Sequence, residues 1–200
     1  YSKSRLGERN IKTNFEEYKL LAPDYFQYDK QEELVDRINI EQYYSHPDPW
    51  RDHTRTNLKN FIISTYSKWR VSQLLTDSGE QFDYVVFLRP DVKYIHKFPV
   101  QELKNVHENN CLIPNFHRYG KPPINDRFSI SNQRNAIIIG QAYNHILDYS
   151  KEKPCHAETF LSNWFKLNNI KQTIFNDFKF CRIRANGAVP RQDRFKGYDK

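Results

Sequence analysis

The stretch FDYVVFLRPDV, residues 82–92, decides the fold class of this 200-residue chain. Its first part, Phe82 to Leu88, is a short apolar run of β-branched and aromatic residues between turn-forming residues, which predicts a buried strand. A helix is expected just before it, over Thr54–Leu75, because apolar residues there recur at helical spacing. A helix followed by a buried strand is typical of a layered α/β domain.

The rest of the chain continues this mixture of helices and strands. Strands are predicted at Cys111–Pro114, Arg127–Ser131, Ile170–Phe175 and Phe180–Arg184, and helices at Gln133–Tyr149 and Pro154–Leu167. Within the first of these helices, Ile137–Gly140 is equally compatible with a strand. The pattern predicts an α/β fold with a central, mostly parallel sheet and helices outside it. In such sheets ligands bind beyond the carboxyl ends of the strands.

The length favours a single domain over residues 1–200. We expect an irregular, partly helical N-terminal part over residues 1–53, an α/β core over residues 54–185 and a basic tail over residues 186–200. The elements predicted in the N-terminal part are short helices at Asn14–Leu21 and Gln31–Ile38 and a Pro-containing loop at Tyr43–Asp52.

The composition excludes several classes of protein. With 14 Phe, 13 Tyr and 3 Trp the chain is too aromatic for intrinsic disorder, and no apolar run approaches the ~20 residues of a membrane span. Lys and Arg outnumber Asp and Glu by 31 to 24, and the charge of +7 favours anionic partners such as nucleic acid, phosphorylated small molecules, acidic glycans or a membrane surface. The C-terminal end is either an anion-attracting segment or a solvated terminus. Its basic residues are Arg182, Arg184, Arg191, Arg194, Lys196 and Lys200, against Asp193 and Asp199.

The cysteines give a prediction about the redox environment. Cys111, Cys155 and Cys181 form no CxxC pair, which argues against a zinc ribbon and against a disulfide scaffold. We therefore expect buried, reduced thiols and a reducing compartment.

The strongest chemical signal lies where the predicted strand runs into Arg89-Pro90-Asp91. Pro90 has no amide hydrogen and ends the hydrogen-bond ladder of the strand. Asp91 is therefore expected at the edge of the sheet, in an open crevice where its carboxylate can hold Mg²⁺ or Mn²⁺. Arg89 can bind a phosphate there through two parallel hydrogen bonds. The alternative is an Arg–Asp surface pair that flanks a turn.

The segment DYVVFLRPDV, residues 83–92, resembles the strand and metal-binding turn of GT-A-type glycosyltransferases, which use nucleotide sugars. In that superfamily the strand ends in Asp-x-Asp. Here Asp91 keeps the second acid and Arg89 stands at the first, as in a branch found in bacteria and large DNA viruses. The resemblance implies a Rossmann-like, three-layer sandwich whose first strand or strands would precede Tyr1. It assigns Arg89 and Asp91 to a UDP- or GDP-linked sugar donor, with Mn²⁺ or Mg²⁺ at Asp91 held weakly or not at all, because Arg89 replaces an acid.

Two further segments carry the resemblance. NDRFSI, residues 125–130, is similar to the strand that follows the metal turn and faces the sugar, which assigns Arg127 to donor binding as well. HAETFL, residues 156–161, is similar to the helix that presents an acidic residue to the acceptor. Glu158 and then Asp126 are the candidates for the catalytic base that an inverting transferase needs. The alternatives are an Asx turn at Asp126 and a favourable acid at the positive end of a helix dipole for Glu158.

The expected function is transfer of a hexosyl or pentosyl group from a nucleotide-diphosphate sugar to a glycan or other hydroxyl acceptor, in the cytoplasm of a cell or of a virus-infected host. One alternative is a nuclease or nucleic-acid-binding domain. Basic and aromatic residues mix at Tyr66, Lys68, Trp69 and Arg70, but the sequence has no recognisable binding module and no dense basic face. The other is a non-catalytic interaction domain on a glycosyltransferase-like scaffold, because Arg89 weakens the metal motif. No specific nucleic acid partner and no membrane span are expected.

Overall fold

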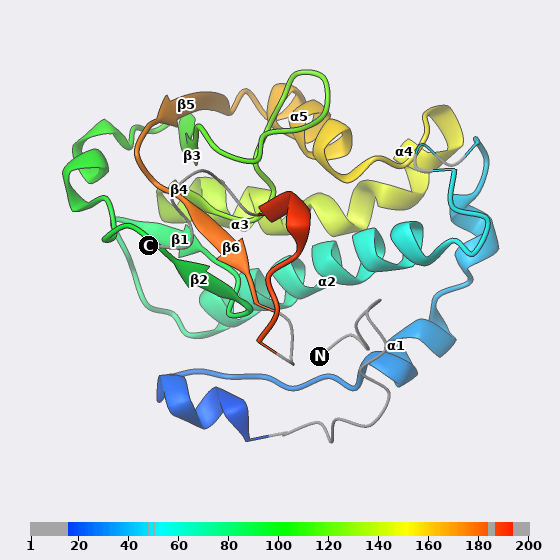
Figure 1. Ribbon diagram of the computed structural model, residues 1–200, viewed down its shortest axis with the longest axis horizontal. Helices are drawn as coiled ribbons and strands as arrows, with labels where there is room; N and C mark the ends of the chain where they lie inside the picture. The colour runs from blue at the N-terminus through cyan, green and yellow to red at the C-terminus, as the bar shows by residue number, and fades with distance from the viewer. Residues whose placement is uncertain (1–15, 48, 50, 184–186, 194–200) are drawn as a thin grey trace.

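The computed structural model describes residues 16–47, 49, 51–183 and 187–193, and it is a mixed α/β structure (Figure 1). Its strands are β1 Val85–Phe87, β2 Val92–Tyr94, β3 Asn110–Pro114, β4 Ser129–Ser131, β5 Lys171–Phe175 and β6 Phe180–Arg182. Its α-helices are α1 Gln31–Arg37, α2 Thr56–Asp77, α3 Gln133–Gln141, α4 Ile146–Glu152 and α5 Ala157–Leu167. Its 3₁₀ helices are η1 Glu17–Leu21, η2 Ile40–Tyr43, η3 Val100–Asn105, η4 Ala142–His145 and η5 Arg191–Asp193.

The central sheet is mixed, and the prediction of a mostly parallel sheet is wrong. Its strand order is β1-β4-β3-β5, with β4 antiparallel to both β1 and β3 and with β3 parallel to β5. A parallel pair needs a crossover connection, usually a helix. The connection from β3 to β4 contains no helix, so β4 returns antiparallel. Helices α3 to α5 lie between β4 and β5, and they let β5 run parallel to β3.

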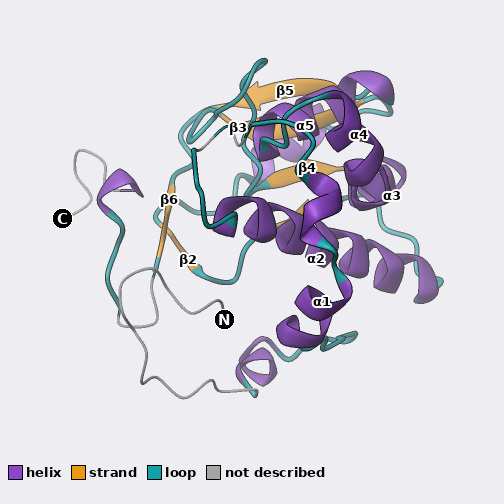
Figure 2. Cartoon of the chain, turned by 90° about the vertical axis from the view of Figure 1, so that its right-hand side faces the viewer, coloured by secondary structure: helices purple, strands orange, loops and turns teal. Residues whose placement is uncertain are grey.

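The two faces of this sheet are covered differently. Cys111 and Ile113 of β3 belong to a core cluster formed with α3 and α5, whereas Leu112, between them, belongs to a second cluster rich in phenylalanine. That second cluster lies beneath a small antiparallel sheet of β2 and β6. Figure 2 shows this small sheet on the opposite side of the molecule from α3 and α4. Helices therefore cover one face of the central sheet, and β2 and β6 cover the other.

The strand predicted at Phe82–Leu88 is present but shorter. Val85–Phe87 forms β1, while Phe82, Tyr84 and Leu88 are exposed. β1 is an edge strand whose partner, β4, offers three paired residues. The ladder therefore ends on both sides before the apolar run does. The strand predicted at Phe180–Arg184 is also confirmed in part, as β6, and it belongs to the small sheet.

The helices follow the prediction closely. The helix predicted over Thr54–Leu75 is α2, and the one predicted over Pro154–Leu167 is α5, which begins at Ala157. The region 133–149 is helical throughout, as α3, η4 and the start of α4, so the strand alternative at Ile137–Gly140 is wrong. Helices α2 and α3 pack directly on each other, and Gly140 marks a close approach. A Cβ placed there would fall within 3.0 Å of Ser72.

Several predictions concern the ends of the chain and the cysteines. The predicted N-terminal helices correspond to η1 and α1, although residues 14 and 15 lie outside the described residues, as do positions 48 and 50 of the predicted loop. In the predicted basic tail, residues 186 and 194–200 also lie outside them, and so does residue 184 at the end of the strand predicted at Phe180–Arg184. The three cysteines are buried and form no disulfide, as predicted. Among the described helices, none combines the length and the apolar character that crossing a bilayer requires.

Candidate functional site

Charged side chains from several distant parts of the chain come together at one end of the central sheet. We call them the charged cluster. It consists of Lys68 of α2, Arg89 and Asp91 between β1 and β2, Asp126 and Arg127 before β4, Glu158 of α5, Arg182 of β6 and Asp193 of η5. All five residues predicted from the sequence are members: Arg89, Asp91, Asp126, Arg127 and Glu158.

The turn between β1 and β2 holds a closed ion pair. Nε of Arg89 donates to Oδ1 of Asp91 at 2.8 Å, and NH2 donates to Oδ2 at 2.6 Å. Burial alone would raise the pKa of Asp91, but the hydrogen bonds and charge of Arg89 hold it below its usual value. The expectation of an open carboxylate at Asp91 is therefore wrong, because both oxygens are engaged by the arginine two residues earlier. The pair is not fully exposed either: 26% of the Asp91 side chain is accessible.

The turn before β4 is built by a buried amide. Asn125 is 1% exposed, its Nδ2 donates to the Phe116 carbonyl at 2.6 Å, and its Oδ1 accepts from the backbone N–H groups of Arg127 and Phe128. This is an Asx turn, and it belongs to Asn125, so the suggested Asx turn at Asp126 is wrong. The side chain of Asp126 is consequently left for contacts within the cluster, with Oδ1 lying 3.7 Å from Nε of Arg127.

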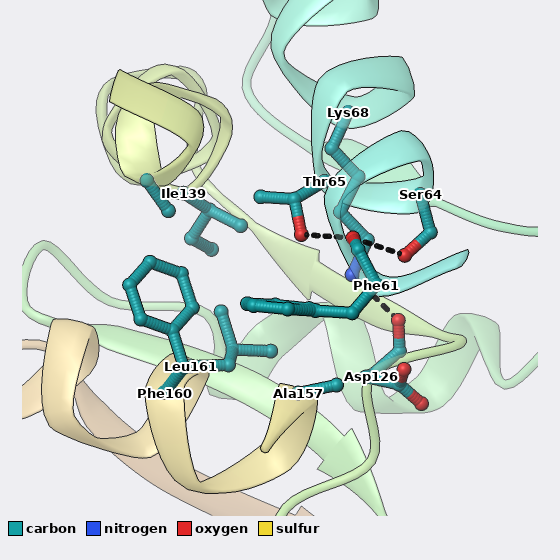
Figure 3. Close-up of a pocket in the computed structure, with 10 residues that line it drawn as sticks. Phe61, Ser64, Thr65, Lys68, Asp126, Ile139, Ala157, Phe160 and Leu161 are labelled. Carbon is teal, nitrogen blue, oxygen red and sulfur yellow. Dashed lines mark hydrogen bonds between the residues drawn. The ribbon is translucent and has the colours of Figure 1, made fainter. Parts of the chain in front are cut away.

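Lys68 crosses from α2 to this turn. Figure 3 shows its side chain passing Thr65 and Phe61, and its Nζ donates to the Asp126 carbonyl at 2.6 Å. Burial lowers the pKa of Lys68, although the charge of Asp126 opposes the shift. The hydrogen bond ties α2 to the segment that presents Asp126 and Arg127.

Lys68 and Asp126 also line a hollow between α2, α3 and α5 (Figure 3). The empty space in it, including part of the adjoining solvent, is about 310 Å³. Its walls are mostly apolar, and Phe61, Phe160 and Leu161 form much of them. Asp91 does not line this hollow, so the cluster and the hollow meet through Lys68 and Asp126.

Glu158 lies in the first turn of α5, and its side chain is 13% exposed. Burial raises the pKa of Glu158, and the carboxylate of Asp126 raises it further. Oε2 of Glu158 lies 3.5 Å from Nδ1 of His156, which also accepts the N-capping hydrogen bond from the Thr159 N–H. The acid is thus shielded from water and close to a second carboxylate.

The loop that precedes Asn125 closes over the start of α5. Gly120 has φ +85°, and a Cβ there would come within 3.0 Å of the Glu158 and Thr159 backbone and of Cβ of Glu158. A side chain would strain this conformation and collide with the helix. Glycine therefore allows the loop to cover Glu158 closely.

Arg182 and Asp193 form the second closed ion pair of the cluster, and sequence reasoning did not single it out as a site. Nε and NH2 of Arg182 donate to the two carboxylate oxygens of Asp193 at 2.6 and 2.8 Å. In the sequence Asp193 is one of two acids among the basic residues of the C-terminal end, and nothing in the local pattern indicates its burial. Lys68 did carry a signal, because it follows Phe61 and Thr65 at helical spacing on the core-facing stripe of α2.

The residues of the cluster do not fit a divalent cation held by the protein. A metal at Asp91 would have one carboxylate ligand, and only after Arg89 had been displaced from it. Within the described ranges, no three side chains of His, Cys, Asp or Glu are grouped to hold a metal. Mg²⁺ and Mn²⁺ prefer several oxygen ligands.

Comparison of the chain with protein-family models, with curated proteins and with solved structures finds no match.

Proposed function

We propose that this chain is a glycosyltransferase with a GT-A-like site, which moves a sugar from a nucleotide diphosphate to a hydroxyl acceptor such as a glycan. One observation carries the proposal. Three segments that are far apart in the chain, residues 89–91, 125–127 and 156–158, bring charged side chains to the same end of the central sheet. The turn after β1 lies beside the turn before β4, and the loop that precedes the second turn packs on Glu158.

The arginines supply the chemistry that a leaving diphosphate requires. Glycosyl transfer passes through an oxocarbenium-like transition state while negative charge grows on the leaving group. Arg89 and Arg127 can each present two parallel N–H groups to phosphate oxygens. Lys68 and His117 fix the position of Arg127. Lys68 bonds the neighbouring carbonyl, and Nδ1 of His117 accepts from NH1 of Arg127 at 2.7 Å.

The carboxylates supply the base. A general base works best when its pKa approaches the working pH, and the pKa of Glu158 is shifted upward, in that direction. Asp126 contributes to this shift, because its negative charge disfavours a second negative charge on Glu158. In an inverting reaction Glu158 would take the proton of the acceptor hydroxyl as the new glycosidic bond forms.

A second candidate is a domain that binds a phosphorylated ligand without turning it over. The observation in its favour is that Arg89 and Arg182 are each already paired with an acid. Donor binding without hydrolysis or transfer would support this candidate over the enzyme.

The test is hydrolysis and transfer measured with a panel of UDP- and GDP-sugars. We expect Glu158→Gln to lower kcat by about 10²- to 10⁴-fold with little change in donor affinity, as for loss of a general base. Glu152→Gln, which neutralises an exposed acid on α4, is the matched control and should keep full activity. If Glu158→Gln and Asp126→Asn both retain wild-type turnover, the assignment of the base is wrong.

The metal expected at Asp91 has a separate test. Because Arg89 engages both oxygens of Asp91, we expect turnover to persist in EDTA. Turnover that EDTA abolishes and Mn²⁺ restores in the wild type, but not in Asp91→Asn, would assign the metal to Asp91 after all.

A further inference from the structure

The C-terminal segment, residues 187–193, inserts a carboxylate into the charged cluster. Asp193 is 1% exposed and accepts three hydrogen bonds from Arg182, two from the guanidinium and one from the backbone N–H at 3.0 Å. NH1 of Arg127 lies 3.8 Å from the same carboxylate. Burial alone would raise the pKa of Asp193, but the hydrogen bonds and charge of Arg182, with Arg127 adding to them, hold it below its usual value. A fully buried anion thus lies between two arginines that come from different elements.

The two arginines are arranged as they would be around a phosphate. Arg182 binds both oxygens of one anion through Nε and NH2, which is the geometry it would use on a phosphoryl group. Arg127 is oriented by His117, whose Nδ1 accepts from NH1 and whose ring stacks on Phe116 with 4.0 Å between centroids. An arginine has no lone pair to offer, so this hydrogen bond requires an unprotonated Nδ1. His117 is therefore a positioning residue, and Arg127 and Arg182 carry the positive charge.

This arrangement continues the surface that is proposed to bind the diphosphate. The N–H of Ile183, the residue after Arg182, donates to the Asp91 carbonyl at 2.9 Å, so the end of β6 lies against the Arg89–Asp91 turn. The charge of Asp193 also acts on Arg89. Arg127 and Arg182 both lie beside the carboxylate of Asp193, so a phosphoryl group that contacts these two arginines would occupy the place of that carboxylate.

The described segment that carries Asp193 is short, and Asp193 links it to Arg182 and Arg127 of the cluster. Val189 is buried, the Asp193 N–H bonds the Pro190 carbonyl within the same turn, and Arg191 is exposed. Displacing Asp193 would free Arg182 and part of the charge of Arg127 without breaking any strand of the central sheet.

We propose that Arg127 and Arg182 form a phosphate-binding site that Asp193 fills in this structure, so that a diphosphate ligand binds by displacing the C-terminal segment. Asp193 then acts as an internal competitor that sets the affinity of the site. The inference rests on the proposed function for the identity of the diphosphate as part of a sugar donor, but the exchange of one anion for another does not depend on transfer.

Isothermal titration with inorganic pyrophosphate tests the exchange. Asp193→Asn removes the competing charge while keeping the shape of the side chain, and we expect it to bind pyrophosphate at least about tenfold tighter than the wild type. Asp177→Asn removes the same charge from an exposed position and should change the affinity by less than about twofold. Adding Arg182→Gln to Asp193→Asn should abolish the gain. An unchanged affinity in folded Asp193→Asn would overturn the proposal and leave Asp193 as a structural tie.

Hydrogen exchange of the wild-type protein gives a second measurement that does not depend on a variant folding. Amides of residues 187–193 should exchange faster at saturating pyrophosphate, because the segment is released. Unchanged or slower exchange there would contradict displacement. Donor turnover on the same proteins separates the two proposals. If Asp193→Asn binds pyrophosphate more tightly but no donor is turned over, the proposed transferase function is wrong. If donors are turned over but Asp193→Asn does not bind pyrophosphate more tightly, the proposed role of Asp193 as a competitor is wrong.

Discussion

The contact between α2 and α3 gives a prediction whose sign and size follow from the structure. Gly140 of α3 faces Ser72 of α2, which is completely buried and whose Oγ donates to the Trp69 carbonyl at 2.7 Å. A Cβ on residue 140 would fall within 3.0 Å of both Oγ and Cβ of Ser72, and 3.1 Å from the Lys68 carbonyl. Rotating the hydroxyl removes one overlap only, since Cβ of Ser72 is fixed to the helix. The helices must separate to admit the methyl group.

Two effects of Gly140→Ala oppose each other. Alanine in a helix interior is favoured over glycine by about 1 kcal/mol. Overpacking of a filled core typically costs about 1–3 kcal/mol, and we expect the upper part of that range here, about 2–3 kcal/mol, because no side-chain rotation relieves the overlap with the buried Cβ of Ser72. We therefore expect a net loss of about 1–2 kcal/mol in the free energy of unfolding. For a chain of this length that lowers Tm by roughly 2–8 °C.

Urea denaturation followed by circular dichroism at 222 nm measures this loss, and a double variant identifies its cause. Ser72→Gly/Gly140→Ala removes the Cβ of residue 72 while adding one at residue 140, so it removes the overlap and should recover stability compared with Gly140→Ala. Ser72→Ala/Gly140→Ala should not, because the overlap of the two Cβ atoms remains. A Gly140→Ala protein as stable as the wild type, or more so, would refute the close contact. The loss should be accompanied by reduced turnover, because Lys68 lies one helical turn before Ser72.

The other predictions concern the charged cluster. Glu158 has a pKa raised by burial and then by Asp126, so its protonated form stabilises the fold, and that contribution is lost as the pH rises through the pKa of the folded state. Glu158→Gln should accordingly be more stable than the wild type above that pKa and equally stable in acid. Urea midpoints at several pH values check this, and parallel curves for the two proteins would contradict it. Lys68→Met keeps the apolar stem but removes the hydrogen bond to the Asp126 carbonyl, so it should lower turnover while changing the free energy of unfolding by less than about 1 kcal/mol. Lys151→Met, at an exposed position, is the control, and equal turnover in both variants would exclude a positioning role for Lys68.

The elements that the sequence predicts correctly are those whose signal is local. Helices α2 and α5 carry apolar residues at helical spacing, and β3 is a compact apolar run, so each can be located without knowledge of its neighbours. The direction of the strands is not local information. It depends on which connection contains a helix, and the sequence of β4 is the same whether it runs parallel or antiparallel to β3. The same limit explains β1, whose length is set by its three-residue partner and not by its own apolar run.

The residues of the candidate site also fall into those that local sequence indicates and those that it does not. Arg89, Asp91 and Glu158 belong to short motifs and could be selected from the sequence. Asp193 could not, because its burial depends on Arg182, 11 positions away in sequence, and on Arg127. For Arg89 and Asp91 the sequence leaves two alternatives open, a phosphate and metal site or an Arg–Asp pair that flanks a turn. The geometry shows the pair, with both oxygens of Asp91 bonded to Arg89.

The internal ion pairs of the cluster affect how any anion can bind there. Arg89 and Arg182 are paired with acids before a ligand arrives, so binding exchanges one anion for another and does not fill an empty positive site. The affinity then depends on how much more strongly a ligand oxygen binds the arginine than the carboxylate that it replaces. A monoanion with a geometry like that of the Asp193 carboxylate therefore gains little. A diphosphate carries more charge than a carboxylate, and as the ligand proposed for this site it would supply anionic oxygens to more than one arginine from a single molecule. If the proposed site is correct, removing either internal acid should broaden the range of anions that bind, because a ligand would no longer have to outcompete a carboxylate of the protein.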